Sequence, residues 1–180
     1  MTDTPTPQAE TPVTDFQTLG LHEGLLHGLD AMGIRKPTPI QAQAIPAAID
    51  GRDLIACAQT GTGKTAAFLL PLIDVIHSYR PKEEGSIRAL IVVPTRELAL
   101  QIDQQMQAIA YYTPITSMPV YGGSDGQSFD QQKAALTGGT EVIIATPGKL
   151  LSHLNLGYVP TKGLEFLVLD EADRMLDMGF

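Results

Sequence analysis

The feature that most constrains the fold is a series of short apolar runs separated by longer stretches with helical spacing. Runs with this composition predict strands that are buried on both faces, and a helix between consecutive strands is typical of a parallel sheet. We therefore predict an α/β fold in which helices cover both faces of a parallel sheet. The expected strands are 53–58, 89–93, 116–121, 141–145 and 166–169.

Apolar residues recur at helical spacing between these runs. In the N-terminal part this spacing runs from Leu19 to Met32, and Gly33 is a plausible stop. Asp50-Gly51 predicts a turn and 81–86 a solvated loop. The other expected helices are 40–49, 65 to about 79, 96 to about 111, 129–136, 148–153 and 172–178.

Composition divides the 180 residues into a tail and one domain. Residues 1–14 are rich in Thr and Pro, so we expect a disordered tail, followed by a single domain over 15–180. No apolar run approaches the roughly 20 residues that span a bilayer, and the N-terminus does not resemble a signal peptide. A single cysteine, Cys57, excludes an internal disulfide framework and is typical of the reducing cytoplasm, where we expect the protein.

The net charge of −8 argues against a broad basic surface for nucleic acid. Any contact with nucleic acid would have to be local, through helix N-termini, backbone amides and a few well-placed Arg or Lys side chains.

Residues 58–65 (AQTGTGKT) fit the phosphate-binding pattern G-x-x-x-x-G-K-[ST] at every position except the first, which is Ala58. Glycines at 61 and 63 let the backbone curl so that its N–H groups point toward one centre, and the following helix adds the positive end of its dipole. Lys64 would reach the β- and γ-phosphates, and the Thr65 hydroxyl would ligate Mg²⁺. A flexible glycine turn is the alternative, but the position between an apolar run and a helix favours a phosphate loop. The candidate nucleotide-binding residues are Ala58, Gln59, Thr60, Gly61, Thr62, Gly63, Lys64 and Thr65.

A second candidate site follows the last apolar run. Asp170 comes directly after that run, at the sheet edge where ligands of α/β proteins bind, so it is placed to hold Mg²⁺ through water. Glu171 could orient the attacking water as a general base. The alternative is an acidic N-cap on the next helix, a role that Asp173 could share. The catalytic candidates are Lys64, Asp170 and Glu171.

Asp170-Glu171-Ala172-Asp173 spells the motif that names the DEAD-box RNA helicases. Residues 58–65, called the glycine loop below, resemble motif I of that family. Residues 33–41 resemble the family's Q motif, with Ile34 where an aromatic residue is usual. The resemblance implies that Gln41 binds N6 and N7 of adenine, which favours ATP over GTP, and that Phe16 stacks on the base. The alternatives are an exposed helix residue for Gln41 and a core anchor for Phe16. Arg35, within the Q motif, is a further nucleotide-binding candidate.

Three further segments resemble RNA-binding motifs of the family. Each would place backbone N–H groups or one cation against sugar and phosphate, whereas an ordinary strand-to-helix turn with a cap is the alternative. Lys149 stands where the family usually has Arg, which keeps the charge and loses the bidentate geometry. The candidates are Pro94, Thr95 and Arg96; Gly122 and Gly123; and Thr146, Pro147, Gly148 and Lys149.

The resemblance implies a RecA-like P-loop NTPase domain, incomplete at its C-terminus, from an ATP-dependent RNA helicase. It implies that ATP and Mg²⁺ are the ligands and that RNA is bound independently of its sequence. It also implies a monomer whose partners act in ribonucleoproteins, RNA decay or ribosome assembly. The family's next strand and its second RecA-like domain are not in the sequence, so we expect weak nucleotide binding and little hydrolysis from this chain. The strand missing from the family's sheet order would lie between 53–58 and 166–169.

Two other functions remain open. A DNA translocase of similar fold would be stimulated by DNA in preference to RNA, although Phe16, Gln41 and the Asp-Glu-Ala-Asp spelling favour the RNA helicase. A non-catalytic clamp or scaffold would retain its function when Glu171 is replaced by Gln.

Overall fold

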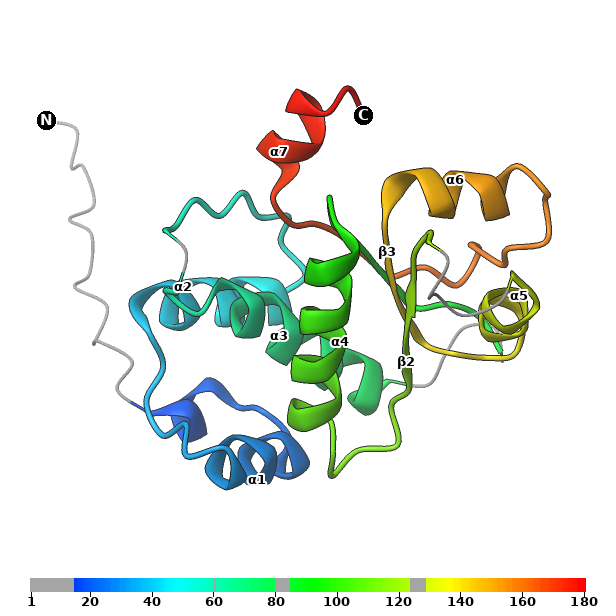
Figure 1. The fold of residues 1–180 in the computed structure, drawn as a ribbon. Coiled ribbons are helices and arrows are strands. Elements are labelled where there is room, and N and C mark those ends of the chain that lie inside the picture. Colours follow the sequence, from blue (N-terminus) through cyan, green and yellow to red (C-terminus); the bar gives the residue numbers. More distant parts are fainter. Residues whose placement is uncertain (1–14, 60, 80–84, 124–128) are drawn as a thin grey trace, which may run out of the picture.

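The computed structural model describes residues 15–59, 61–79, 85–123 and 129–180 (Figure 1). The expected tail 1–14, Thr60 and most of the expected loop 81–86 lie outside these residues. The elements are η1 (Phe16–Leu19), α1 (Glu23–Ala31), α2 (Pro39–Ile49), α3 (Lys64–Ser78), β1 (Ala89–Val92), α4 (Arg96–Ile109), β2 (Ser117–Val120), α5 (Phe129–Thr137), β3 (Val142–Ala145), α6 (Pro147–Leu154), β4 (Phe166–Leu169) and α7 (Ala172–Asp177).

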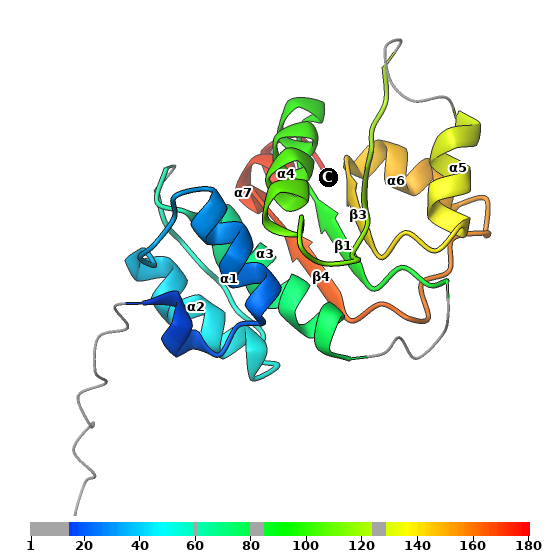
Figure 2. The same ribbon diagram turned by 90° about the horizontal axis from the view of Figure 1, so that it is seen from below.

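The described strands form one parallel sheet in the order β2-β3-β1-β4. Val120, Ala145, Val92 and Leu169 stand in one row across it, so all four strands end at the same edge. Figure 2 shows α1, α2 and α3 gathered on the β4 side of the sheet and α5 and α6 on the β2–β3 side. The predicted α/β fold with a parallel sheet is confirmed.

Alternating strand residues supply two cores, one on each face of the sheet. Ile91 and Ile144 point toward the first core, which contains buried side chains of α1, α2, α3 and α4. Val92 and Ile143 point toward the second, which contains Leu136 of α5, Leu150 of α6 and Met175 of α7. The second face is less fully covered, because Leu167 and Leu169 of the edge strand β4 are exposed on it.

The predicted strand over 53–58 is wrong. These residues form no strand, and all but Ala58 are exposed, including Ile55 at 98%. A strand needs a neighbour for its backbone N–H and C=O groups, and the outer side of β4 pairs with no described strand. An apolar run predicts a buried strand only where the sheet offers a partner, and this condition cannot be read from the run itself.

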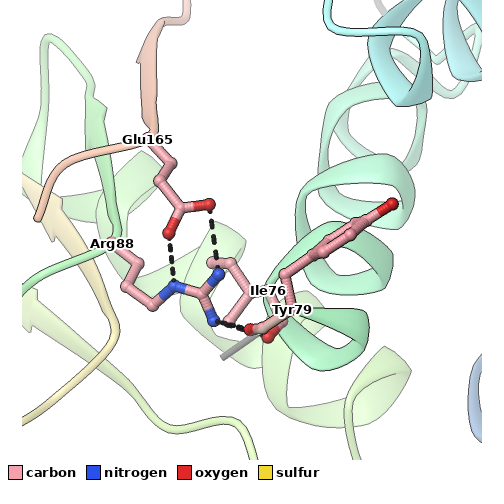
Figure 3. A network of polar contacts seen from close by, with 4 residues as sticks. All are labelled: Ile76, Tyr79, Arg88 and Glu165. Carbon is pink, nitrogen blue, oxygen red and sulfur yellow. Dashed lines mark hydrogen bonds and ion pairs between the residues drawn. The ribbon is translucent and has the colours of Figure 1, made fainter. Parts of the chain in front are cut away.

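One buried ion pair ties the start of the sheet to the end of α3 (Figure 3). Arg88, just before β1, is 3% exposed and forms two hydrogen bonds, of 2.8 and 3.1 Å, with the carboxylate of Glu165, just before β4. Its third nitrogen, Nη1, donates to the carbonyl oxygens of Ile76 at 2.5 Å and Tyr79 at 2.8 Å. The guanidinium therefore satisfies carbonyls at the C-terminus of α3 and fixes that helix against the starts of β1 and β4.

We predict that Glu165→Ala lowers the free energy of unfolding by about 3 kcal/mol, because the buried guanidinium loses its counter-charge. Thermal and urea unfolding followed by circular dichroism measure this loss. The matched control is Asp30→Ala, which removes the carboxylate of an exposed pair with Arg35 at 3.9 Å and should change stability by less than about 0.5 kcal/mol. Equal effects of the two substitutions would contradict the role assigned to Arg88.

Candidate functional site at the carboxyl edge of the sheet

Asp170 and most of the RNA-binding candidates lie where the strands end. The glycines at 122 and 123 follow β2, Thr146 follows β3, Thr95 and Arg96 follow β1 by a short turn, and Asp170 follows β4. Adjacent strands lie about 4.8 Å apart, so the in-register strand ends make a continuous row. The carboxyl edge of an open parallel sheet is the usual ligand-binding edge of such folds.

Two glycines of the glycine loop have a left-handed backbone. Gly61 and Gly63 have φ values of +80° and +86°, a region that side chains with a Cβ rarely adopt. Gly63 is the N-cap of α3 and provides no side-chain cap, so the first amides of that helix are open to an anion. Lys64 and Thr65 are the first two residues of α3, and Thr62 Oγ1 donates to the Gln59 carbonyl at 2.7 Å.

Gln41 joins the Q-motif segment to the glycine loop. Its Oε1 accepts from the Thr38 backbone N–H at 3.0 Å, and its Nε2 donates to the Gly63 carbonyl, also at 3.0 Å. It is 4% exposed, so the alternative of an exposed helix residue is wrong. A Cβ on Gly63 would lie 2.4 Å from Gln41 Nε2, so a larger residue there would be strained by its φ and would displace the Gln41 amide from this hydrogen bond.

The other Q-motif candidates lie in contrasting surroundings. Phe16 is 3% exposed and belongs to the first core, as its core-anchor alternative predicts, so its ring offers little surface for stacking on a base. Arg35 is exposed, with its guanidinium Nε 3.9 Å from an oxygen of Asp30.

The acidic motif, residues 170–173, contains a residue with a left-handed backbone. Glu171 has φ +51° and ψ +44°, and it is the one non-glycine residue with positive φ in the described part of the chain. Such a conformation costs about 1–3 kcal/mol and is concentrated at functional sites. Glu171 N–H donates to Asp170 Oδ1 at 3.0 Å, while its carboxylate accepts from Arg174 Nη1 at 3.2 Å. Glu171 occupies the N-cap position of α7 with no side-chain cap hydrogen bond, which argues against the simple capping alternative.

Burial raises the pKa of the Asp170 carboxyl above its ordinary value, whereas the hydrogen bond from Glu171 and the positive charge of Lys64 act in the opposite direction. Asp170 and Lys64 line the same cavity, of about 460 Å³. The rest of the lining is largely apolar, contributed by α2, α3, residues 51–56 and β4. The cavity therefore holds the polar pair at one end and continues along the outer side of β4, where the strand over 53–58 did not form.

The donor atoms near this cavity suit Mg²⁺. The described residues contain no cluster of three or more His, Cys, Asp or Glu side chains able to hold a metal. Mg²⁺ needs no such cluster, because it usually takes one or two protein oxygens together with substrate phosphates and water. The hydroxyl of Thr65 and the carboxylate of Asp170 are oxygen donors of this kind.

The RNA-binding candidates form a second group farther along the row. The Arg96 guanidinium lies 5.1 Å from the ring centroid of Tyr121, and a Cβ on Gly123 would be 3.2 Å from Arg96 Nη1. Thr95 Oγ1 accepts from the Leu98 N–H at 3.3 Å and so caps α4, as the alternative for this segment predicts. Lys149, at the start of α6, has its Nζ 4.9 Å from the ring centroid of Phe129.

Two comparisons with known proteins bear on this edge. The DEAD/DEAH box helicase family matches residues 38–180. This chain belongs to that family. It is 42% identical over 168 residues to the DEAD-box ATP-dependent RNA helicase CshA of Bacillus cereus, covering 93% of this chain and 31% of that protein. It is 46% identical over 172 residues to the probable ATP-dependent RNA helicase ddx27 of Dictyostelium discoideum, covering 95% of this chain and 22% of that protein.

The chain thus spans less than a third of the length of these relatives. A third relative, the ATP-dependent RNA helicase CshA of Listeria monocytogenes, shows the same proportions, at 42% identity over 93% of this chain and 31% of its own length.

The described helices include none with the length and apolar content to cross a membrane.

Sequence reasoning missed the polar links that hold the site together. The hydrogen bond from Gln41 to Gly63 spans 22 residues, and that from His153 to Gln132 spans 21. Neither has a local pattern that would reveal it. The Arg88–Glu165 pair had a weak signal, since each charged residue directly precedes the segment of an apolar strand.

We predict that Gln41→Glu weakens nucleotide binding and lowers the free energy of unfolding by about 1–3 kcal/mol, because a carboxylate cannot donate to the Gly63 carbonyl. Isothermal titration with an ATP analogue and thermal melting measure the two effects. Gln43→Glu, an exposed substitution of the same kind on the same helix, is the control and should leave both unchanged. If both variants behave alike, the hydrogen bond between Gln41 and the glycine loop contributes neither to nucleotide binding nor to stability.

Proposed function

We propose that this chain is the ATP- and RNA-binding part of an ATP-dependent RNA helicase. The observation that carries the proposal is that Lys64, at the start of α3, and Asp170, at the end of β4, line one cavity. Beside them, Glu171 has a strained left-handed backbone and the glycine loop leaves the N-terminus of α3 uncapped. A phosphate ligand, an attacking water and the residues to hold both fit this arrangement.

The roles follow from the chemistry of each side chain. Lys64 and the first amides of α3 would bind the β- and γ-phosphates, and Gln41 would hold the loop in its curled form while its remaining amide hydrogen and lone pair are directed to adenine. Thr65 and Asp170 would hold Mg²⁺, which neutralises charge on the phosphate oxygens when bound. Glu171 would orient the water and accept its proton.

The RNA would bind farther along the same edge. The three candidate segments after β1, β2 and β3 offer exposed glycine backbone, two helix N-termini and the cations Arg96 and Lys149. Contacts of this kind reach sugar and phosphate and would be independent of base sequence. They also reconcile RNA binding with a net charge of −8, because the positive groups are local.

The unwinding reaction belongs, in this proposal, to a longer protein. The relatives are named as RNA helicases, and the chain matches less than a third of each. No described strand pairs with the outer side of β4, the segment 53–57 is exposed, and a cavity lies between them. These features support a further strand at that position. A second domain would supply the remaining half of the RNA groove and an arginine toward the γ-phosphate.

We predict that Lys64→Ala weakens binding of a fluorescent ATP analogue by about 10- to 100-fold, through loss of a charge-assisted contact worth about 1.5–3 kcal/mol. Fluorescence titration in the presence of Mg²⁺ measures this change. Lys162→Ala is the control, since Lys162 is exposed near the start of β4, at the opposite edge of the sheet. Unchanged affinity in the Lys64 variant would contradict the phosphate role of the loop.

We predict that Arg96→Ala and Lys149→Ala each weaken binding of a fluorescein-labelled oligouridine and reduce the slope of log K against log salt by about one. Fluorescence anisotropy at several salt concentrations measures both, again with Lys162→Ala as the control. The corresponding oligodeoxythymidine distinguishes RNA from DNA. Tighter binding to the DNA strand would favour a DNA translocase over the proposed function.

A further inference from the structure

A chain of buried polar side chains lies beneath the RNA-binding candidates. Gln132 of α5 and His153 of α6 are both buried. Gln132 Nε2 donates to the backbone carbonyl of Tyr121 at 2.9 Å, and Gln132 Oε1 lies 3.0 Å from His153 Nε2. The other ring nitrogen of His153, Nδ1, is hydrogen-bonded to the hydroxyl of Tyr158. Burying such groups is unfavourable unless each is hydrogen-bonded, and in this chain of contacts each has a partner.

The direction of every bond in this chain can be assigned. A backbone carbonyl only accepts, so the amide nitrogen of Gln132 must face Tyr121 and its oxygen must face His153. His153 Nε2 must then carry the hydrogen, and in the neutral ring Nδ1 accepts from the Tyr158 hydroxyl. Burial, and next the charge of Lys149, lower the pKa of His153, which favours the neutral ring that this assignment requires.

The chain of bonds begins in the segment of one RNA-binding candidate and passes through α6, the helix that carries another. Tyr121, where it begins, directly precedes Gly122 and Gly123, and its ring lies under the Arg96 guanidinium. In α6, the His153 ring stacks on Phe129, with centroids 4.6 Å apart and planes 18° from parallel. The Lys149 ammonium lies 4.9 Å from the centroid of the same Phe129 ring.

We propose that Gln132 and His153 are positioning residues. They hold Gly122, Gly123 and Lys149 in one fixed arrangement that binds RNA phosphates. The proposal rests on the proposed RNA-binding function and adds to it two residues that touch no RNA themselves. Hydrogen bonds are directional, so the chain from Tyr121 to His153 fixes how α5 and α6 lie relative to the end of β2. The stacked Phe129 then limits where the flexible Lys149 side chain can place its charge.

The test compares oligouridine affinity across matched variants of this chain. Gln132→Glu has the same shape but cannot donate to the Tyr121 carbonyl, and His153→Ala removes the ring. Each should weaken RNA binding by about tenfold, the equivalent of one hydrogen bond of roughly 1.4 kcal/mol. His153→Gln can place an N–H donor near the position of Nε2 and should recover most of the affinity, whereas His153→Asn should not.

The remaining readouts separate positioning from general stability. His27→Ala, which removes an exposed histidine, is the control, and affinity for the ATP analogue reports whether each variant is folded at the nucleotide site. Equal RNA affinity in wild type, Gln132→Glu and His153→Ala would overturn the inference and leave the proposed function intact. A wild-type chain that binds no RNA would overturn the proposed function and this inference together.

The tautomer of His153 provides a measurement that does not depend on the variants. A long-range ¹H–¹⁵N spectrum of the wild-type chain should show the hydrogen on Nε2. A hydrogen on Nδ1 would overturn the assigned chain of bonds. This test of the hydrogen-bond directions needs no variant, so it applies even if a variant melts below the assay temperature.

Discussion

The parallel register of the sheet is the constraint on which every other feature depends. Because the strands run in the same direction and their last residues stand in one row, the turns that follow them meet at a single edge. Residues far apart in sequence, such as Arg96, Gly123 and Asp170, are therefore brought to that edge by the topology of the sheet. The register is held in turn by apolar side chains that alternate into two cores, and at the opposite edge by the Arg88–Glu165 pair.

Polar links between elements add the precision that backbone topology alone lacks. Gln41 holds the glycine loop against α2, and the chain through Gln132 and His153 connects the end of β2 with α6. In both cases a buried side-chain amide is bonded to the backbone of a glycine-containing turn or to the residue before it. In both places, therefore, a buried side chain fixes the backbone conformation of a flexible glycine turn.

Features that depend on nearby residues could be predicted from the sequence. The helices α2, α3 and α4 and the strands β1, β3 and β4 came within a few residues of their expected bounds, because apolar spacing and glycine stops are local signals. The curled loop at Gly61 and Gly63 was predicted for the same reason. Features that depend on a partner could not be. The run 53–58 lacks a neighbouring strand, and the burial of Gln41 depends on elements that pack over it. The left-handed backbone of Glu171 has no sequence signal at all.

The central claim is that one edge of the sheet carries two adjacent sites, one for nucleotide and one for RNA. Hydrogen–deuterium exchange of this chain with and without ligands tests it most directly. An ATP analogue with Mg²⁺ should slow amide exchange at 61–66 and 170–172, and an oligouridine should slow it at 95–98, 121–123 and 146–149. The residues that precede the strands at the opposite edge, 85–88, 139–141 and 163–165, should not respond. Protection confined to that opposite edge, or the same protected segments for both ligands, would contradict the account.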